Sequence, residues 1–142
     1  MVLYARDILV KDFLMLPGET SAIEAARVMK EKRHGFVLVA SGSRPEGIVT
    51  EWDYLARVTA EGNDPAHITL RDIMTREVVS VKENDSFEYI AKLMTEKGIR
   101  RVVVTRNEEI VGVITTRAVM AKLEEYVDKV SSLIARLQAP PF

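Results

Sequence analysis

The stretch Gly47-Ile48-Val49-Thr50-Glu51-Trp52-Asp53 decides how this chain folds. Its short β-branched run predicts a buried strand that ends at Thr50, and the residues from Trp52 onward predict a helix. Thr50 and Asp53 are therefore expected at a strand-to-helix junction, where free backbone N–H groups and the helix dipole suit an anionic or hydroxyl-rich ligand. The same Thr-x-x-Asp spacing is also typical of a capping box, which only closes the start of a helix. The motif alone leaves both interpretations open.

A second copy of the motif, Gly112-Val113-Ile114-Thr115-Thr116-Arg117-Ala118, follows 65 positions later, with Ala118 in the place of Asp53. The same offset aligns other positions without a gap, so the chain contains an internal repeat. Two copies predict a closed pseudo-symmetric pair rather than a solenoid, because each copy alone is near the size at which a core is marginal. The aligned positions include Arg6-Asp7-Ile8 with Arg71-Asp72-Ile73, Ser21 with Ser86, Met29 with Met94, Val37 with Val102 and Val39 with Val104.

The composition excludes several kinds of partner and site. The 142 residues carry a formal net charge of −1, which gives no general attraction to nucleic acid or to a membrane surface. The sequence has no cysteine, so disulfides and thiolate metal sites are excluded and a cytoplasmic location is favoured. The two histidines, His34 and His67, are too few for a multi-histidine metal site within one chain. No apolar run approaches the length of a membrane span, and no signal-peptide pattern opens the chain.

The sequence also lacks the patterns of common catalytic and phosphate-binding sites. Neither Gly-x-Gly-x-x-Gly nor Gly-x-x-x-x-Gly-Lys occurs, which excludes the Rossmann and P-loop interpretations. No nucleophile–base pair or carboxylate dyad stands out, and His34 is read as a surface or junction residue rather than a general base. We therefore expect a protein that is not an enzyme and that holds no catalytic cofactor or metal.

The pattern of apolar residues and turn signals predicts an α/β (α+β) fold of two β-α-β-β-α repeats, with a long C-terminal helix. We expect repeat one at 6–58, a linker at 59–70, repeat two at 71–123 and a helical extension at 124–142. The first repeat is expected to contain strands at 13–16, 36–39 and 47–50, with helices at 21–33 and 52–60. The second is expected to contain strands at 78–81, 101–105 and 110–115, with helices from 85 or 86 to 98 and from 117 onward.

Two adjacent arginines, Arg100 and Arg101, stand at the start of a predicted buried strand. They could belong to a solvated turn, or they could bind phosphate, which suits the planar guanidinium group. The matching positions of repeat one, Gly35 and Phe36, carry no charge. If the repeats pack face to face, Asp53 of one repeat could share a cleft with the arginine pair of the other.

These residues resemble a tandem pair of CBS (cystathionine-β-synthase) domains, a Bateman module. The resemblance covers residues 6–123 and rests on the doubled β-α-β-β-α order, on Arg-Asp-Ile-Met before repeat two, on Gly-Ile-Arg-Arg-Val-Val-Val before its central strand, and on Gly-Ile-Val-Thr-x-x-Asp in repeat one. It implies two clefts related by a pseudo-twofold axis, which in this family bind adenosine-containing ligands such as AMP, ADP or ATP. In that family pattern the Asp holds the ribose hydroxyls, the Thr contacts phosphate, apolar residues enclose the adenine and basic residues meet the phosphates.

The resemblance implies a binding site in one cleft between the two repeats, and a mirror cleft at the equivalent positions 65 residues away. Ala118 departs from the family pattern and the mirror cleft lacks the arginine pair, so we expect that cleft to bind more weakly or to stay empty. Without the resemblance, Val78 and Val79 would be read as plain core. The implied site consists of Thr50, Asp53, Val78, Val79, Ile99, Arg100 and Arg101, and the mirror cleft of Thr115, Ala118, Phe13, Leu14, His34 and Gly35.

The resemblance implies a regulatory adenine-nucleotide sensor that acts on a partner protein. The alternatives are a structural pairing module with empty clefts and a binder of another adenosyl compound such as S-adenosylmethionine. Nucleic acid is not expected, because single strands usually require exposed aromatic residues among basic ones and this chain has few aromatic residues. The last predicted helix carries an apolar seam that indicates a homodimer, although the seam could instead fold back on its own chain. This seam consists of Leu123, Tyr126, Val130, Leu133 and Leu137.

Overall fold

The computed structural model describes residues 2–140 and contains two three-stranded sheets, one in each repeat. In each sheet the first strand is parallel to the second, and the second is antiparallel to the third. The residue pairs between the second and third strands recur 65 positions later in the other repeat, including the register shift after Val39 and Val104. This repeated register confirms the predicted α/β fold of two similar halves. The strands are β1 (Leu14–Leu16), β2 (Phe36–Ser41) and β3 (Arg44–Thr50), then β4 (Ser80–Lys82), β5 (Arg101–Arg106) and β6 (Glu109–Thr115).

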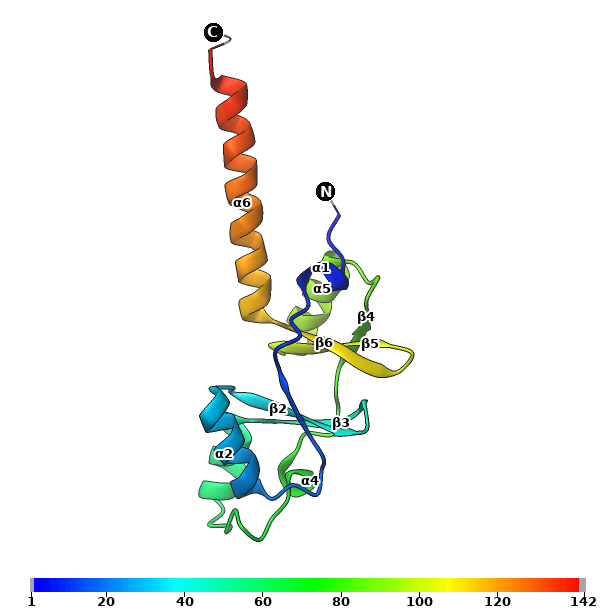
Figure 1. Cartoon of the computed structure of the whole chain (residues 1–142), viewed down its shortest axis with the longest axis vertical. Coiled ribbons are helices and arrows are strands. Elements are labelled where there is room, and N and C mark those ends of the chain that lie inside the picture. The colour runs from blue at the N-terminus through cyan, green and yellow to red at the C-terminus, as the bar shows by residue number, and fades with distance from the viewer. Residues whose placement is uncertain (1, 141–142) are drawn as a thin grey trace.

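The two sheets face each other, and most of the helices lie on their outer sides (Figure 1). Because both faces of β2 are covered, its residues from Phe36 to Ala40 are all buried and form a continuous apolar run. Successive side chains alternate between the two faces. Val37 and Val39 pack into the core of the first repeat, while Leu38 packs between the sheets against Val103 of β5.

The principal helix of each repeat, α2 (Ala22–Lys32) or α5 (Phe87–Lys97), is closed in the same way at both ends. Ser21 and Ser86 cap their N-termini, each accepting a hydrogen bond from a backbone N–H at 3.2 Å. Both helices end in the left-handed conformation, at Gly98 with φ 61° in α5 and at Arg33 with φ 58° in α2. Glycine adopts this conformation freely, whereas arginine does so at an energetic cost.

The sequence did not predict two short helices, α1 (Ala5–Ile8) and α4 (Leu70–Ile73). Each of them packs into the core of the other repeat rather than its own. The α1 helix opens repeat one in the sequence but buries Ala5 and Ile8 in the core of repeat two. The α4 helix opens repeat two in the sequence but buries Leu70 and Ile73 in the core of repeat one. Backbone bridges fix both contacts, between Tyr4 and Ser86 and between Ser21 and Thr69. Each repeat therefore completes its core with a segment of the other.

Other elements differ from the prediction mainly in their bounds. The helix expected at 52–60 is a turn of α-helix, α3 (Glu51–Asp53), followed by a π-helix, η1 (Tyr54–Thr59). Contacts outside this helix favour the unusual winding, because the Tyr54 hydroxyl donates to the Ala22 carbonyl and Arg57 donates to two carbonyls of the α4 segment. The strand expected at 78–81 begins only at Ser80, where pairing with β5 begins.

The last helix, α6 (Thr116–Gln138), leaves the body of the protein and contains no fully buried residue. Near its start it contacts α1, and beyond that it projects away from both repeats (Figure 1). Residues 141 and 142 of the expected extension lie outside the described part of the chain. Within residues 2–140, no helix combines the length and the apolar character that crossing a membrane requires.

Candidate functional site

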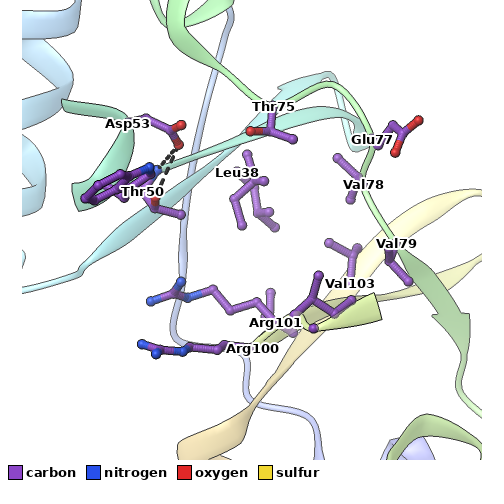
Figure 2. A pocket seen from close by; sticks show the side chains of 15 residues that line it. Leu38, Thr50, Asp53, Thr75, Glu77, Val78, Val79, Arg100, Arg101 and Val103 are labelled. Atoms are coloured by element: carbon purple, nitrogen blue, oxygen red, sulfur yellow. Dashed lines mark hydrogen bonds between the residues drawn. The ribbon is translucent and has the colours of Figure 1, made fainter. Parts of the chain in front are cut away.

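A cleft of about 430 Å³ lies between the two repeats, and every residue of the predicted site lines it. Thr50 and Asp53 come from the junction of β3 and α3. Across the cleft, Arg101 begins β5 and Arg100 directly precedes it. Figure 2 shows both arginine side chains extending toward the end of the cleft where Thr50 lies, with Val78, Val79 and Val103 at the opposite end. The cleft thus has a polar end and an apolar end. Its size is within the range of small-molecule sites.

Asp53 is buried, with 5% of the residue exposed, and its carboxylate has two roles available to it. Its Oδ2 accepts hydrogen bonds from the Thr50 backbone N–H at 2.8 Å and from the Thr50 hydroxyl at 3.2 Å (Figure 2). These contacts form a capping box, so the structural interpretation of the motif is correct. Its Oδ1 lies 3.8 Å from Arg57 Nε. A carboxylate has about four lone-pair sites, so this Asp retains acceptor capacity toward the cleft while it caps the helix.

The two arginines differ in their surroundings. Arg100 is exposed, and its backbone carbonyl accepts a hydrogen bond from the Thr116 N–H at 3.0 Å, which ties the site to the start of α6. Arg101 is half-buried, and its guanidinium lies 4.7 Å from the centre of the Phe36 ring, a cation–π contact between the two repeats. Burial lowers the pKa of Arg101, the nearby Glu51 carboxylate opposes that change, and Arg100 adds to it. Arg100 is consequently the cation that a ligand can reach most easily.

Two residues of repeat one hold the surroundings of Arg101 in place. The Glu51 backbone N–H donates to the Gly35 carbonyl at 3.1 Å. A methyl group at Gly35 would lie 2.6 Å from the Glu51 Oε1, so glycine leaves the space in which this carboxylate rests. The Glu51 carboxylate is thereby kept near Arg101.

The sequence missed several residues that line the same cleft. Leu38 and Val103 belong to the central strands β2 and β5, which the sequence assigned to the core without indicating which side chains border a cavity. Trp52 lies inside the motif itself, yet 68% of the residue is exposed at the rim of the cleft. The further lining residues are Ile48, Thr75, Glu77, Gly98 and Val113.

The mirror positions around Thr115 and Ala118 have different chemistry. The Thr115 hydroxyl accepts from the Ala118 backbone N–H at 3.1 Å, so the helix is capped here without a carboxylate. In place of Ile99 stands His34, whose Nε2 lies 3.4 Å from Asp12 Oδ1. Phe13, in place of Val78, packs against the core between the two sheets. Leu14 is buried in the core of repeat one, and Gly35 lies against the Glu51 side chain. Ala118 presents no acceptor for a ribose.

The sequence pattern of the CBS domain family matches this chain twice, at residues 5–60 and 70–125. A relative at the sequence level is an uncharacterized protein of Methanopyrus kandleri, 35% identical over 113 residues, which are 78% of this chain and 57% of that protein. The chain spans less than two thirds of the length of the curated relatives that it matches first.

Solved structures of similar fold include oligomeric and ligand-bound proteins. A hexameric CBS-CP12 protein from bloom-forming cyanobacteria is 31% identical with a TM-score of 0.76, over 86% of this chain and 72% of that one. A CBS domain protein from Pyrobaculum aerophilum, solved in complex with AMP, is 27% identical with a TM-score of 0.73, over 82% of this chain and 89% of that one.

Proposed function

This chain belongs to the CBS domain family, and we propose that it is a non-catalytic regulatory module that binds an adenine nucleotide, AMP, ADP or ATP, between its two repeats. The observation that carries this proposal is the arrangement of one cleft, with a buried carboxylate and two arginines at its polar end and valines at its other end. The complex of the Pyrobaculum aerophilum relative with AMP supports the same ligand class.

Each part of a nucleotide has a matching surface in this cleft. Two vicinal ribose hydroxyls can donate to the Asp53 carboxylate, which accepts but does not donate when ionised. Val78, Val79 and Ile99 offer apolar walls to a purine. Arg100 and Arg101 offer guanidinium groups to phosphate, with which they form strong charge-assisted hydrogen bonds. A ligand without phosphate, such as S-adenosylmethionine, would leave the arginines without a partner and is the second candidate.

A panel of ligands tests the proposal directly. A ligand that binds only the folded protein raises its melting temperature, so we expect AMP, ADP and ATP to raise it more than GTP or S-adenosylmethionine. Calorimetry should give a single tight site per chain, because Ala118 removes the ribose acceptor from the mirror cleft. Ala118→Asp should strengthen binding at that second cleft. Two equal sites in the unaltered protein, or a larger response to S-adenosylmethionine than to AMP, would contradict the proposal.

We further propose that the protein forms a homodimer through the apolar seam of α6. Leu133 and Leu137 are 51% and 85% exposed in the single chain, and both belong to the part of α6 that extends beyond the family match. The hexameric cyanobacterial relative shows that proteins of this fold assemble. Covering such side chains is favourable, at roughly 25 cal/mol for each Å² of apolar surface removed from water.

Sedimentation of the full chain tests the dimer. Leu133→Asp with Leu137→Asp should yield a monomer at micromolar concentration, because charges would be buried in the seam. Ser132→Asp, on another side of the same helix, should remain dimeric. If the unaltered protein is monomeric at this concentration, or if the double variant remains dimeric, the seam is not the interface. A protein that this module regulates would be a further partner, and we propose that the module itself acts in the cytoplasm.

A further inference from the structure

Trp52 lines the cleft, but the proposed function assigns it no contact with the nucleotide. It is the only tryptophan in the chain, it lines the cleft, and 68% of the residue is exposed in a single chain. It follows Thr50 by two residues, so it belongs to the polar end of the cleft, where Arg100 and Arg101 also lie. The indole offers a phosphate only one hydrogen-bond donor, its Nε1–H, and the rest of the ring is an apolar face. An exposed aromatic ring at a binding site is a surface on which another planar ring can stack.

The polarity of the cleft sets the order of groups in a bound ligand. The base takes the apolar end beside Val78 and Val79, and the phosphates reach Arg100 and Arg101. A group that follows the phosphates would lie at the exposed rim of the polar end, which Trp52 lines. We infer that the cleft is built for an adenosine compound that carries a second planar ring beyond a diphosphate, a dinucleotide, and that this ring stacks on Trp52. This inference rests on the proposed function, because it assumes that adenosine occupies the apolar end.

The position of Trp52 agrees with such a role. Residues at the start of α3 are held by the capping box of Asp53, so the indole is carried on a fixed turn of helix rather than on a loop. The mirror position is Arg117, which offers no aromatic ring. The aromatic ring, the carboxylate and the arginine pair thus line one cleft.

Two ligands of equal charge isolate the contribution of the second ring. ADP-ribose and diadenosine diphosphate both contain adenosine, two phosphates and a second ribose, but only the latter carries a second base. Stacking of a base on an aromatic side chain is worth about fivefold or more in affinity. We expect diadenosine diphosphate to bind at least fivefold more tightly than ADP-ribose, which exceeds the roughly twofold statistical advantage of its two equivalent ends. Trp52 fluorescence should change more on binding the dinucleotide than on binding ADP-ribose.

Variants separate stacking from a role of Trp52 in assembly. Trp52→Ala should reduce the affinity for diadenosine diphosphate to the level of ADP-ribose and leave the affinity for ADP-ribose within twofold. Leu55→Ala is the matched control, since Leu55 is 53% exposed one helical turn further on but does not line the cleft. It should leave the preference for the dinucleotide unchanged.

Three results would overturn the inference. Equal affinities of the unaltered protein for the two ligands would show that no second ring is bound. An equal loss of both ligands in Trp52→Ala would place the indole against the first nucleoside. A Trp52→Ala protein that loses its dimer and keeps the ligand preference would assign the indole to the interface between copies. If AMP binds but the dinucleotide has no advantage, only this inference fails, whereas the failure of every adenosine compound to bind also ends the proposed function.

Discussion

Replacing Asp53 by Ala removes a helix cap and a cleft carboxylate at the same time, so its effects on stability and on affinity have to be measured separately. The cap consists of two hydrogen bonds from Thr50 to Oδ2, at 2.8 and 3.2 Å. Loss of such a cap costs about 1 kcal/mol of the free energy of unfolding. Loss of two ribose hydrogen bonds to a charged acceptor costs roughly 1.5–3 kcal/mol each, or about tenfold or more in affinity for each bond.

The chain contains a matched control for this experiment. Asp72 caps α4 through the same pair of contacts from Thr69, at 2.8 and 3.1 Å, but it does not line the cleft. Asp72→Ala should therefore lower the free energy of unfolding by about 1 kcal/mol as well, and it should leave the dissociation constant for AMP unchanged. Comparing the two variants separates the loss of AMP affinity caused by a missing ligand contact from any loss caused by a missing capping box.

The assay is urea unfolding for stability and calorimetry with AMP for affinity, at a temperature where all three proteins are folded. We expect Asp53→Ala to weaken AMP binding by about tenfold at the least. If its dissociation constant stays within twofold of the unaltered protein, Asp53 is only a cap and the ligand lies elsewhere. The same conclusion follows if Asp72→Ala weakens binding as much as Asp53→Ala does.

Three further predictions concern the helix ends, the alkaline stability and the phosphate end of the cleft. Arg33→Gly should raise the free energy of unfolding by up to about 1 kcal/mol, because Arg33 has φ 58°. Gly98→Ala should lower the free energy of unfolding by a similar amount because of its backbone conformation, since an added methyl group would meet no atom within 4 Å. Unchanged urea midpoints would contradict both expectations. Burial raises the pKa of Tyr54 to about 12, so the folded state favours the protonated phenol. This stabilisation is complete below the unfolded value near pH 10 and is lost as the pH rises through the folded value. Tyr54→Phe should cost roughly 0.5–1.5 kcal/mol at pH 7 through its lost hydrogen bond, and this deficit should shrink toward pH 12; parallel pH profiles, with Tyr89→Phe as the exposed control, would refute the reasoning. Arg100→Ala should weaken binding of AMP and ADP severalfold and binding of adenosine little, because it acts on phosphate; equal losses for all three in calorimetry would place the arginine elsewhere.

The sequence predicted those parts of the molecule that depend on local pattern and on repetition. The gapless offset predicted two similar halves, and the family resemblance assigned Thr50, Asp53 and the arginine pair to one cleft from their sequence positions alone. The sequence could not predict α1 or α4, because a four-residue helix has no apolar period to detect and depends on packing for its stability. The winding of η1 was unpredictable for a similar reason, since its partners Ala22 and the α4 carbonyls lie far away in the sequence.

Two of the residues missing from the predicted site, Leu38 and Val103, were missed for the same physical reason. Leu38 and Val103 lie on strands that are buried on both faces, so their alternation with neighbouring residues carries no signal of which face borders a cavity. Whether a buried strand residue touches a ligand or only its neighbours depends on how the two sheets meet. The way in which the two sheets meet is a property of the whole molecule and not of either repeat.

The exchange of α1 and α4 means that neither repeat is a self-sufficient piece of protein. A fragment cut in the linker would carry α1 with no core to receive it, and it would leave the groove for Leu70 and Ile73 empty. Two such fragments could satisfy each other only by trading these helices, as domain-swapped subunits do. The present chain is thus equivalent to a swapped pair of single repeats that has been joined covalently. Its two halves cannot separate without exposing buried residues of both cores, Ala5 and Ile8 in one and Leu70 and Ile73 in the other.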